Sequence, residues 1–248
     1  MNQILQKIFI ECNRAINTGE LITKVSSTDK EFSFQNWFQK KLQALNLNFD
    51  TPSRNAYPDF RLVDYPLGFE VKGLAFPGRE ANYDCNSQVP SGIHNGRTIY
   101  YVFGRYPAQT KEKSYPVYDL VICHGDFLNA DHDYIHKNKN LKGFGSYGDI
   151  MIRDRKMYVA PTPFALVNGA ERQVTLIVPG EWKSNNAMVC SVGSFVRKES
   201  DTLIRGYSFD MASNTITATY IKNPNAGKIH SFQAYRTSCS QGNTVSLR

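Results

Sequence analysis

Two acidic residues and one lysine lie close together in one short stretch of the chain. Asp59 follows a proline, and a ten-residue spacer separates it from the triplet Glu70-Val71-Lys72. Alternate residues of a β-strand point to opposite sides, so Glu70 and Lys72 share one face while Val71 points into the core. If residues 59–63 and 69–72 pair as a hairpin, Asp59 comes close to that polar face.

The chemistry that such residues can do is hydrolysis of a phosphodiester bond. Two carboxylates can hold Mg²⁺, a hard cation that prefers oxygen ligands and keeps several waters. The metal can polarise a phosphodiester oxygen, and Lys72 can position the attacking water or offset the charge that develops on the phosphate. The alternative is an ordinary hairpin whose charges lie on a solvated surface.

Spacing alone does not single out this triplet, because the chain contains three of the form acid-x-Lys. The other two are Asp154-Arg155-Lys156 and Glu181-Trp182-Lys183. The first is in a charged stretch and the second follows Pro-Gly, so both are expected in turns. Only the triplet at Glu70 has apolar neighbours on both sides and Pro-Asp at hairpin distance upstream.

The elements around the hairpin are predicted from periodicity. Residues 1–18 form an amphipathic helix, and a second helix begins near Ser27 or Thr28, with Glu31 placed for a capping box. Its apolar residues follow helical spacing and predict a face that packs on a sheet. These residues are Phe34, Trp37, Phe38, Leu42 and Leu45.

Beyond the hairpin, residues 73–97 have little periodicity and are predicted to form a long loop, which is usually functional or disordered. The remaining chain alternates apolar runs with turn residues and predicts further strands. These are expected at 98–103, 117–123, 150–152, 158–160, 175–178, 188–192 and 215–221. The pattern predicts one α/β domain over residues 1–248 with a β-rich C-terminal part.

The Pro-Asp dipeptide, the spacer and Glu70-Val71-Lys72 resemble the motif of the PD-(D/E)xK nucleases, chiefly type II restriction endonucleases. The resemblance covers about residues 28–73. It implies that Asp59 and Glu70 are metal ligands and that Lys72 is the catalytic lysine. It also implies a restriction-endonuclease-like fold, a mixed central β-sheet flanked by helices, with a catalytic core of about 28–165 and a C-terminal part of about 170–248.

Many members of that family also place an acid or an amide on the helix before the motif. Here Glu31 or Gln35 could fill that position, and capping of the helix is an equal alternative for Glu31.

The 73–97 segment leaves the proposed catalytic strand directly, so its polar side chains are candidates for DNA contact. Arginine pairs with guanine, and asparagine or glutamine with adenine, in the major groove. Any solvated loop contains the same residue types, which is the alternative. The candidates are Arg79, Asn86, Ser87, Gln88, His94 and Arg97, with Arg105 and Lys111 as weaker candidates for phosphate contact.

A net charge of +7 and a pI near 9.1 favour a polyanionic partner. Residues 183–248 carry eight Lys or Arg against three Asp or Glu, so the C-terminal quarter is expected to face phosphates. A solvated basic surface is the alternative. The sequence contains no run of about 18 apolar residues, so no membrane-spanning segment is predicted. The five cysteines are far apart, so we expect no zinc knuckle, no disulfide framework and a reduced, cytoplasmic setting.

Two further patterns do not support a site. Residues 143–148 match G-x-G-x-x-G, but no apolar strand precedes them and an extended run follows, which excludes the dinucleotide-binding fingerprint. A group of histidines and aspartates is interpreted as a solvated polar loop in preference to a metal cluster. It comprises His124, Asp126, His132, Asp133 and His136.

The sequence therefore predicts a bacterial, Mg²⁺-dependent restriction endonuclease that cuts double-stranded DNA at a short specific sequence and leaves 5′-phosphates. A homodimer is expected, because a two-fold protein can cut both strands of a palindromic site. One alternative is a DNA repair or recombination nuclease of the same fold that recognises DNA structure. Another is a DNA-binding module without catalysis.

Overall fold

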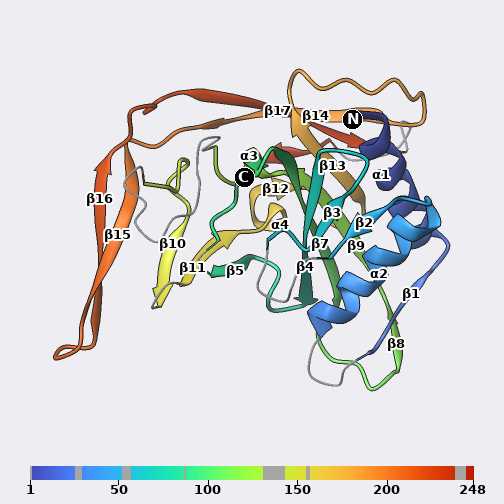
Figure 1. Cartoon of the computed structure of the whole chain (residues 1–248), viewed down its shortest axis with the longest axis horizontal. Helices are drawn as coiled ribbons and strands as arrows, with labels where there is room; N and C mark the ends of the chain where they lie inside the picture. Colours follow the sequence, from blue (N-terminus) through green and yellow to red (C-terminus); the bar gives the residue numbers. More distant parts are fainter. Residues whose placement is uncertain are drawn as a thin grey trace.

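The structure is a computed structural model that describes residues 2–25, 30–51, 57–86, 88–130, 143–154, 157–237 and 244–248. Within these residues the chain is mixed α/β, with a large central sheet that contains both parallel and antiparallel neighbours (Figure 1). The mixed central sheet expected from the sequence is therefore confirmed.

The central sheet has the strand order β14-β17-β13-β9-β7-β4-β3-β2, with β6 paired to β7. The neighbours β4/β7 and β9/β13 are parallel, and the remaining pairs are antiparallel. Its strands are β2 (Phe49–Asp50), β3 (Phe60–Leu62), β4 (Leu67–Phe76), β6 (Ile93–His94), β7 (Arg97–Pro107), β9 (Asp119–His124), β13 (Val174–Pro179), β14 (Cys190–Lys198) and β17 (Ile229–Arg236).

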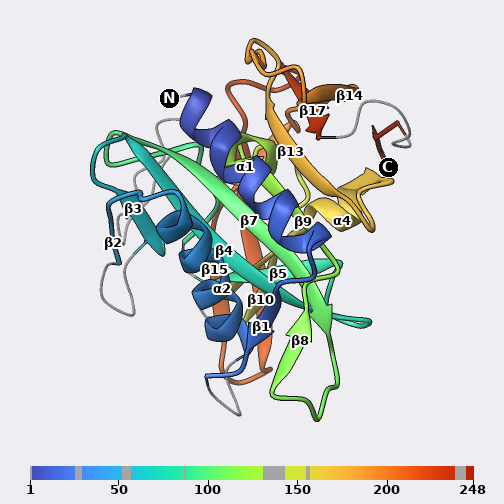
Figure 2. The ribbon, with the colours of Figure 1, turned by 90° about the vertical axis from the view of Figure 1, so that its right-hand side faces the viewer.

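Two long helices, α1 (Asn2–Asn17) and α2 (Lys30–Ala44), lie across one face of this sheet (Figure 2). Their apolar side chains share a buried core with Phe69 and Val71 of β4. Helix α2 approaches the sheet closely over two glycines that are cross-strand neighbours, Gly73 and Gly104. A side chain on Gly104 would overlap the ring of Phe34, so this glycine pair sets how near the helix can lie.

The opposite face carries a second core and a smaller sheet of β5 (Asn82–Asn86), β11 (Met157–Pro161) and β10 (Met151–Asp154). Beyond it, β15 (Thr202–Asp210) and β16 (Thr215–Lys222) form a two-stranded ribbon that projects from the body (Figure 1). The short elements are β1 (Leu21–Thr23) paired with β8 (Ser114–Pro116), β12 (Val167–Asn168) paired with β18 (Ser246–Leu247), α3 (Gly125–Leu128) and α4 (Pro163–Leu166).

The prediction of a long loop for residues 73–97 is wrong. Strand β4 continues to Phe76, and β5 and β6 both lie within this segment. The β4 extension pairs with β7 across residues 67–76 and 98–107, a partner distant in sequence. The predicted helix caps, Ser27 and Thr28, lie outside the described residues.

The β-rich C-terminal part is confirmed, but the strand expected at 188–192 runs from Cys190 to Lys198, and β15 and β17 were not predicted. We expected no disulfide framework, and the sequence did not indicate that Cys190 is disulfide-bonded, as it is in the structure. Cys12, Cys85 and Cys123 are free and buried. No helix among the described residues is long and apolar enough to cross a membrane.

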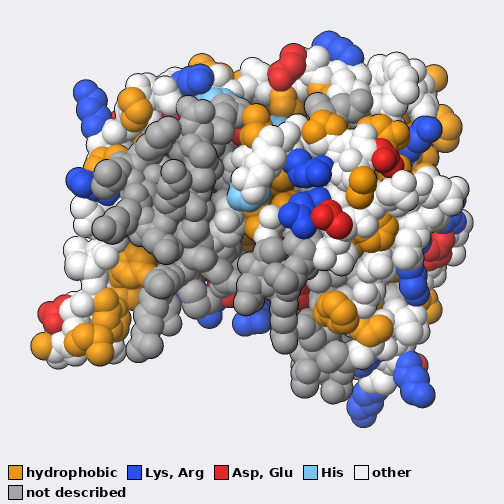
Figure 3. Space-filling model, viewed as in Figure 1, with side chains coloured by type: hydrophobic (Ala, Val, Ile, Leu, Met, Phe, Trp, Pro, Cys, Tyr) orange, Lys and Arg blue, Asp and Glu red, His pale blue; other side chains and the backbone are white. Residues whose placement is uncertain are grey.

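Two of the charges expected on a phosphate-facing C-terminal surface are buried inside the protein. Arg197 forms an ion pair with Asp149, and Arg236 donates to Thr175 and to the carbonyl of Gly169. Arg248 also pairs with Glu171. On the face drawn in Figure 3, the coloured Lys and Arg side chains are spread among uncharged ones without forming one stripe.

The glycine contact of α2 gives a test of the fold. We expect Gly104→Ala to destabilise the protein by about 1–3 kcal/mol, because the new methyl group overlaps Phe34 in a packed core. Thermal unfolding followed by circular dichroism should show a Tm lower by roughly 5–10 °C. Gly206→Ala on β15 is the matched control, since its added carbon meets no atom within 4 Å. Equal melting of the two variants would contradict this packing.

Candidate active site at the free edge of strand β4

Strand β4 has a strand neighbour on both sides only near its start. In the described part of the chain, β3 pairs with β4 at two positions, Phe60 with Phe69 and Arg61 with Gly68, whereas β7 pairs with it along its whole length. Past Phe69, the edge of β4 on the β3 side therefore needs other hydrogen-bond acceptors.

Asp59 supplies one of these acceptors. Its Oδ2 accepts a hydrogen bond of 2.8 Å from the backbone N–H of Val71. The carboxylate thus takes the place that the next residue pair of a regular hairpin would fill. This bond fixes Asp59 between the two residues of β4 that could do chemistry, Glu70 and Lys72.

Glu70 and Lys72 lie on the face of β4 opposite α2, while Phe69 and Val71 are fully buried on the helix side. The Nζ atom of Lys72 lies 2.8 Å from Oε1 of Glu70 and 3.5 Å from Oε1 of Glu31. Glu31 belongs to the first turn of α2, so helix and strand both contribute to the site. Gln35 is half-buried one turn further along α2, on the same side of the helix as Glu31.

The charges at this edge do not balance. Burial and the neighbouring charge of Glu70 raise the pKa of Asp59 to about 7, although Lys72 and the Val71 N–H oppose the rise. Three carboxylates, those of Asp59, Glu70 and Glu31, surround one lysine. The site therefore has an excess of negative charge that a cation would relieve.

Lys72 is held in its charged form. Burial alone would lower the pKa of its ammonium group, but Glu70, Glu31 and Asp59 outweigh burial and keep the pKa above its usual value. A lysine in this state can neutralise charge on a phosphate, and it does not accept a proton at neutral pH.

A group of tyrosines lies next to Glu70. Tyr101 of β7 is the register neighbour of Glu70, and its hydroxyl oxygen lies 2.9 Å from that of Tyr57. Burial, with the charge of Glu70 adding to it, raises the pKa of both phenols well above the usual value. Both hydroxyls therefore stay protonated and can donate hydrogen bonds.

Sequence reasoning did not find these tyrosines. Tyr57 directly precedes Pro58-Asp59, which was an available signal. Tyr101 could not be found, because its place beside Glu70 depends on the pairing of two strands about 30 residues apart.

The residues of this site fit Mg²⁺ better than a metal that needs a complete protein cage. Among the described residues, no three His, Cys, Asp or Glu side chains form a group that could hold a metal ion. Mg²⁺ is commonly bound through one or two carboxylates, with waters and substrate phosphates as the remaining ligands. Asp59 and Glu70 offer two carboxylates, and the raised pKa of Asp59 marks the unbalanced charge between them.

Some of the candidate DNA-contacting side chains are exposed, and others form contacts within the protein. Arg79 is exposed in the turn after β4, and Lys111 is exposed before β8. Gln88 is half-buried, while Ser87 and the side chain of Asn86 lie outside the described part of the structure.

His94 packs edge-on against Tyr57 at 4.9 Å between ring centroids. Burial, together with the charge of Arg61, lowers its pKa, so His94 is neutral at pH 7. A neutral imidazole can hydrogen-bond a base edge but does not neutralise a phosphate.

Two arginines have structural roles. Arg97 donates from Nη1 to the carbonyls of Leu62 and Tyr65, which holds the turn between β3 and β4. Arg105 is buried in an ion pair with Asp119, so the expectation that it contacts phosphate is wrong.

The His124 and Asp126 pair is buried at the start of α3, which contradicts the solvated loop expected there. His124 caps the short helix, because its Nδ1 accepts a hydrogen bond from the Asp126 N–H. His132, Asp133 and His136 lie outside the described residues.

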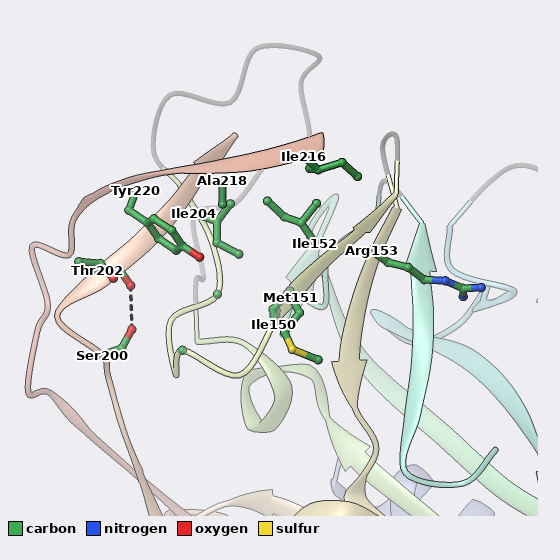
Figure 4. Close-up of a pocket in the computed structure, with 12 residues that line it drawn as sticks. Ile150, Met151, Ile152, Arg153, Ser200, Thr202, Ile204, Ile216, Ala218 and Tyr220 are labelled. Atoms are coloured by element: carbon green, nitrogen blue, oxygen red, sulfur yellow. Dashed lines mark hydrogen bonds between the residues drawn. The ribbon is translucent and has the colours of Figure 1, made fainter. Parts of the chain in front are cut away.

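A separate cleft of about 580 Å³ lies between β10 and the ribbon of β15 and β16 (Figure 4). Ile152 lies on one side of it and Ile216 on the other, and Arg153 points away from it. Arg153 pairs with Asp84 on β5. Among the described residues that line this cleft, none is acidic.

Because the pKa of Asp59 is raised, its carboxylate is expected to reduce the stability of the folded protein by an amount that depends on pH. The folded protein binds the proton of the Asp59 carboxyl group more tightly than the unfolded chain does. The stability that this group contributes is therefore complete at low pH and is lost as the pH rises from about 4 to about 7. We expect Asp59→Asn, without metal at pH 8, to be more stable by about 1–3 kcal/mol, and the difference to shrink towards pH 4.5.

Thermal unfolding in EDTA across this pH range measures the difference. Asp64→Asn is the matched control, because Asp64 is an exposed carboxylate on the same hairpin that bonds Asn48. A constant difference between Asp59→Asn and wild type at every pH would show that Asp59 is not strained.

Comparisons with protein-family models, with curated proteins and with solved structures find no significant match to this chain. The residues at the edge of β4 and the motif in the sequence are therefore the basis for its proposed function.

Proposed function

We propose that the protein is a Mg²⁺-dependent endonuclease of the PD-(D/E)xK type that hydrolyses phosphodiester bonds of double-stranded DNA. The observation that carries this proposal is the convergence of Asp59, Glu70 and Lys72 at the free edge of β4. The Asp59 carboxylate is bound to Val71, between the other two residues. Glu31, which the motif family would place on the preceding helix, also reaches Lys72.

The fold is compatible with this proposal. The central sheet is mixed, with Asp59 directly before β3 and Glu70 and Lys72 on β4, its antiparallel neighbour, and this arrangement supports the proposal. The net charge of +7 favours a polyanionic substrate.

Each residue has a distinct part in the proposed reaction. Asp59 and Glu70 would hold Mg²⁺, whose chemistry at such a site is polarisation of a phosphodiester oxygen and activation of water. Lys72, which its carboxylate neighbours keep charged, offsets the negative charge that develops on the phosphate. Glu31 keeps the lysine oriented towards the edge of β4 through its ion pair.

The substrate and assembly follow from the same proposal. We infer a type II restriction endonuclease that acts in a bacterial cytoplasm, recognises a short sequence and leaves 5′-phosphates. Arg79, Gln88 and His94 are in the segment that follows the catalytic strand, and they are the described candidates for DNA contact. A homodimer would place one site on each strand of a palindrome.

Two other functions predict different behaviour. A repair or recombination nuclease of the same fold would cut DNA according to its structure, without discrete sequence-dependent fragments. A DNA-binding module would bind without Mg²⁺ and would be indifferent to loss of Lys72.

Plasmid cleavage with Mg²⁺ or with EDTA tests the proposal directly. We expect wild type to give discrete Mg²⁺-dependent fragments, and Asp59→Ala and Lys72→Ala to lose at least about 10³-fold in rate, because each removes a charge that the reaction uses. Asp64→Ala is the control for loss of a carboxylate on the same hairpin, and it should cut as wild type does.

The outcomes separate the alternatives. A Mg²⁺-dependent smear that is lost in both variants would indicate a nuclease without sequence specificity. Binding without cleavage under any divalent metal would indicate the module. Cleavage that survives both substitutions would place the chemistry elsewhere in the protein.

A further inference from the structure

The turn between β6 and β7 is a tight two-residue turn that carries an asparagine at its tip. His94 and Arg97 are register partners across the turn, so Asn95 and Gly96 are its two central residues. Both have positive φ, 49° and 74°, as a type I′ turn requires, and this turn strongly prefers the pair Asn-Gly. Asn95 is exposed, so the hairpin presents its amide group to solvent from a rigid support.

The amide of Asn95 is held in one orientation by His94. Its Nδ2 donates a hydrogen bond of 3.1 Å to Nε2 of His94. The imidazole can accept this bond because burial, together with the charge of Arg61, lowers its pKa and keeps the ring neutral at pH 7. Tyr57 holds the imidazole in turn, since the two rings pack edge-on at 4.9 Å between centroids. His94 thus connects a packed tyrosine to an exposed amide.

The bond to His94 leaves half of the amide available. An asparagine side chain has two N–H donors and one carbonyl oxygen, and one of the N–H groups is used by His94. The second N–H and the Oδ1 atom are a donor and an acceptor side by side, the groups that pair with the N7 and N6 atoms of adenine in the major groove. A phosphate offers acceptors alone and would leave Oδ1 without a donor. The amide therefore fits a base edge better than it fits the DNA backbone.

This turn lies on the same face of the central sheet as the carboxylate of Glu70. His94 is the register partner of Arg97 on β7. Tyr101 is four residues further along β7 and is the register partner of Glu70 on β4. Register partners share a face, and so do residues an even number apart on a strand. From the usual strand spacing and rise per residue, the Cα atoms of His94 and Glu70 lie roughly 15 Å apart. This distance spans about five base pairs of DNA.

We propose that Asn95 recognises an adenine in the major groove within about five base pairs of the cut, and that His94 is the positioning residue that orients its amide. This inference rests on the proposed function, because it assumes sequence-specific cleavage at the edge of β4. The competing explanation is conformational, since asparagine is also favoured at positive φ without any ligand. That explanation gives the bond to His94 no role, and it predicts that Asn95→Gly has no effect on specificity.

The test is to sequence the DNA ends that the full chain produces with Mg²⁺ from a library of random sequence. Asn95→Gly keeps the turn, because glycine adopts the same positive φ, but it removes the amide. We expect wild type to prefer adenine at one position within about five base pairs of the cut. In Asn95→Gly this preference should fall roughly 5- to 150-fold, while preferences at the other positions stay unchanged.

Two further variants test the role of His94 and the specificity of the effect. His94→Phe keeps an aromatic ring beside Tyr57 but removes the acceptor of the Asn95 amide. The preference for adenine at the same position should fall roughly 2- to 10-fold, the usual contribution of one hydrogen bond. Asn214→Gly is the matched control, because Asn214 is also exposed and also has a positive φ in the turn between β15 and β16. It should leave the cleavage pattern unchanged.

Specific results would overturn the inference while leaving the nuclease intact. One is an unchanged adenine preference in Asn95→Gly, and another is a wild-type pattern without adenine in that window. A rate that falls equally on all sequences would indicate a phosphate contact, and a lower Tm with an unchanged pattern would indicate a structural role, and either would also overturn it. If wild type cuts no DNA with any divalent metal, the proposed function and this inference both fail.

Discussion

The hydrogen bond from the Val71 N–H to Asp59 is the contact on which the candidate site depends. Strand β4 is central at its start and has a free edge past Phe69, and a buried strand must satisfy its backbone groups. The Asp59 side chain does this in place of a neighbouring strand. A backbone requirement thus fixes a carboxylate beside Glu70, at an edge of β4 that no described strand covers past Phe69.

Helix α2 completes the arrangement from the other side of the sheet. Phe34 rests over the glycine pair of β4 and β7, and it lies one turn after Glu31. The depth at which the helix docks therefore also sets the reach of Glu31 towards Lys72. Core packing and site geometry are therefore coupled. A methyl group added at the glycine pair would displace the helix, and Glu31 would move with it.

The sequence predicted what depends on local patterns. The hairpin of Asp59, Glu70 and Lys72 follows from alternation and from the turn residues Pro66 and Gly68, and α2 follows from its helical spacing. It did not predict features that depend on distant pairing. The extension of β4 needs β7 beside it, and the roles of Arg97 and Arg105 depend on the carbonyl of Leu62 and on Asp119. Charge counts failed for Arg197 and Arg236, because composition does not show burial.

The energetics of the site argue for catalysis over simple binding. A surface that only holds DNA needs exposed cations, such as Arg79 and Lys111. At β4 the protein instead buries a carboxylate whose pKa is raised to about 7 beside a second carboxylate. Such an arrangement destabilises the metal-free fold at neutral pH, and it weakens attraction for a polyanion. Proteins retain strained, like-charged groups of this kind where a cation and a reaction use them. These energetics therefore support the proposed metal-dependent centre over a binding surface without catalysis.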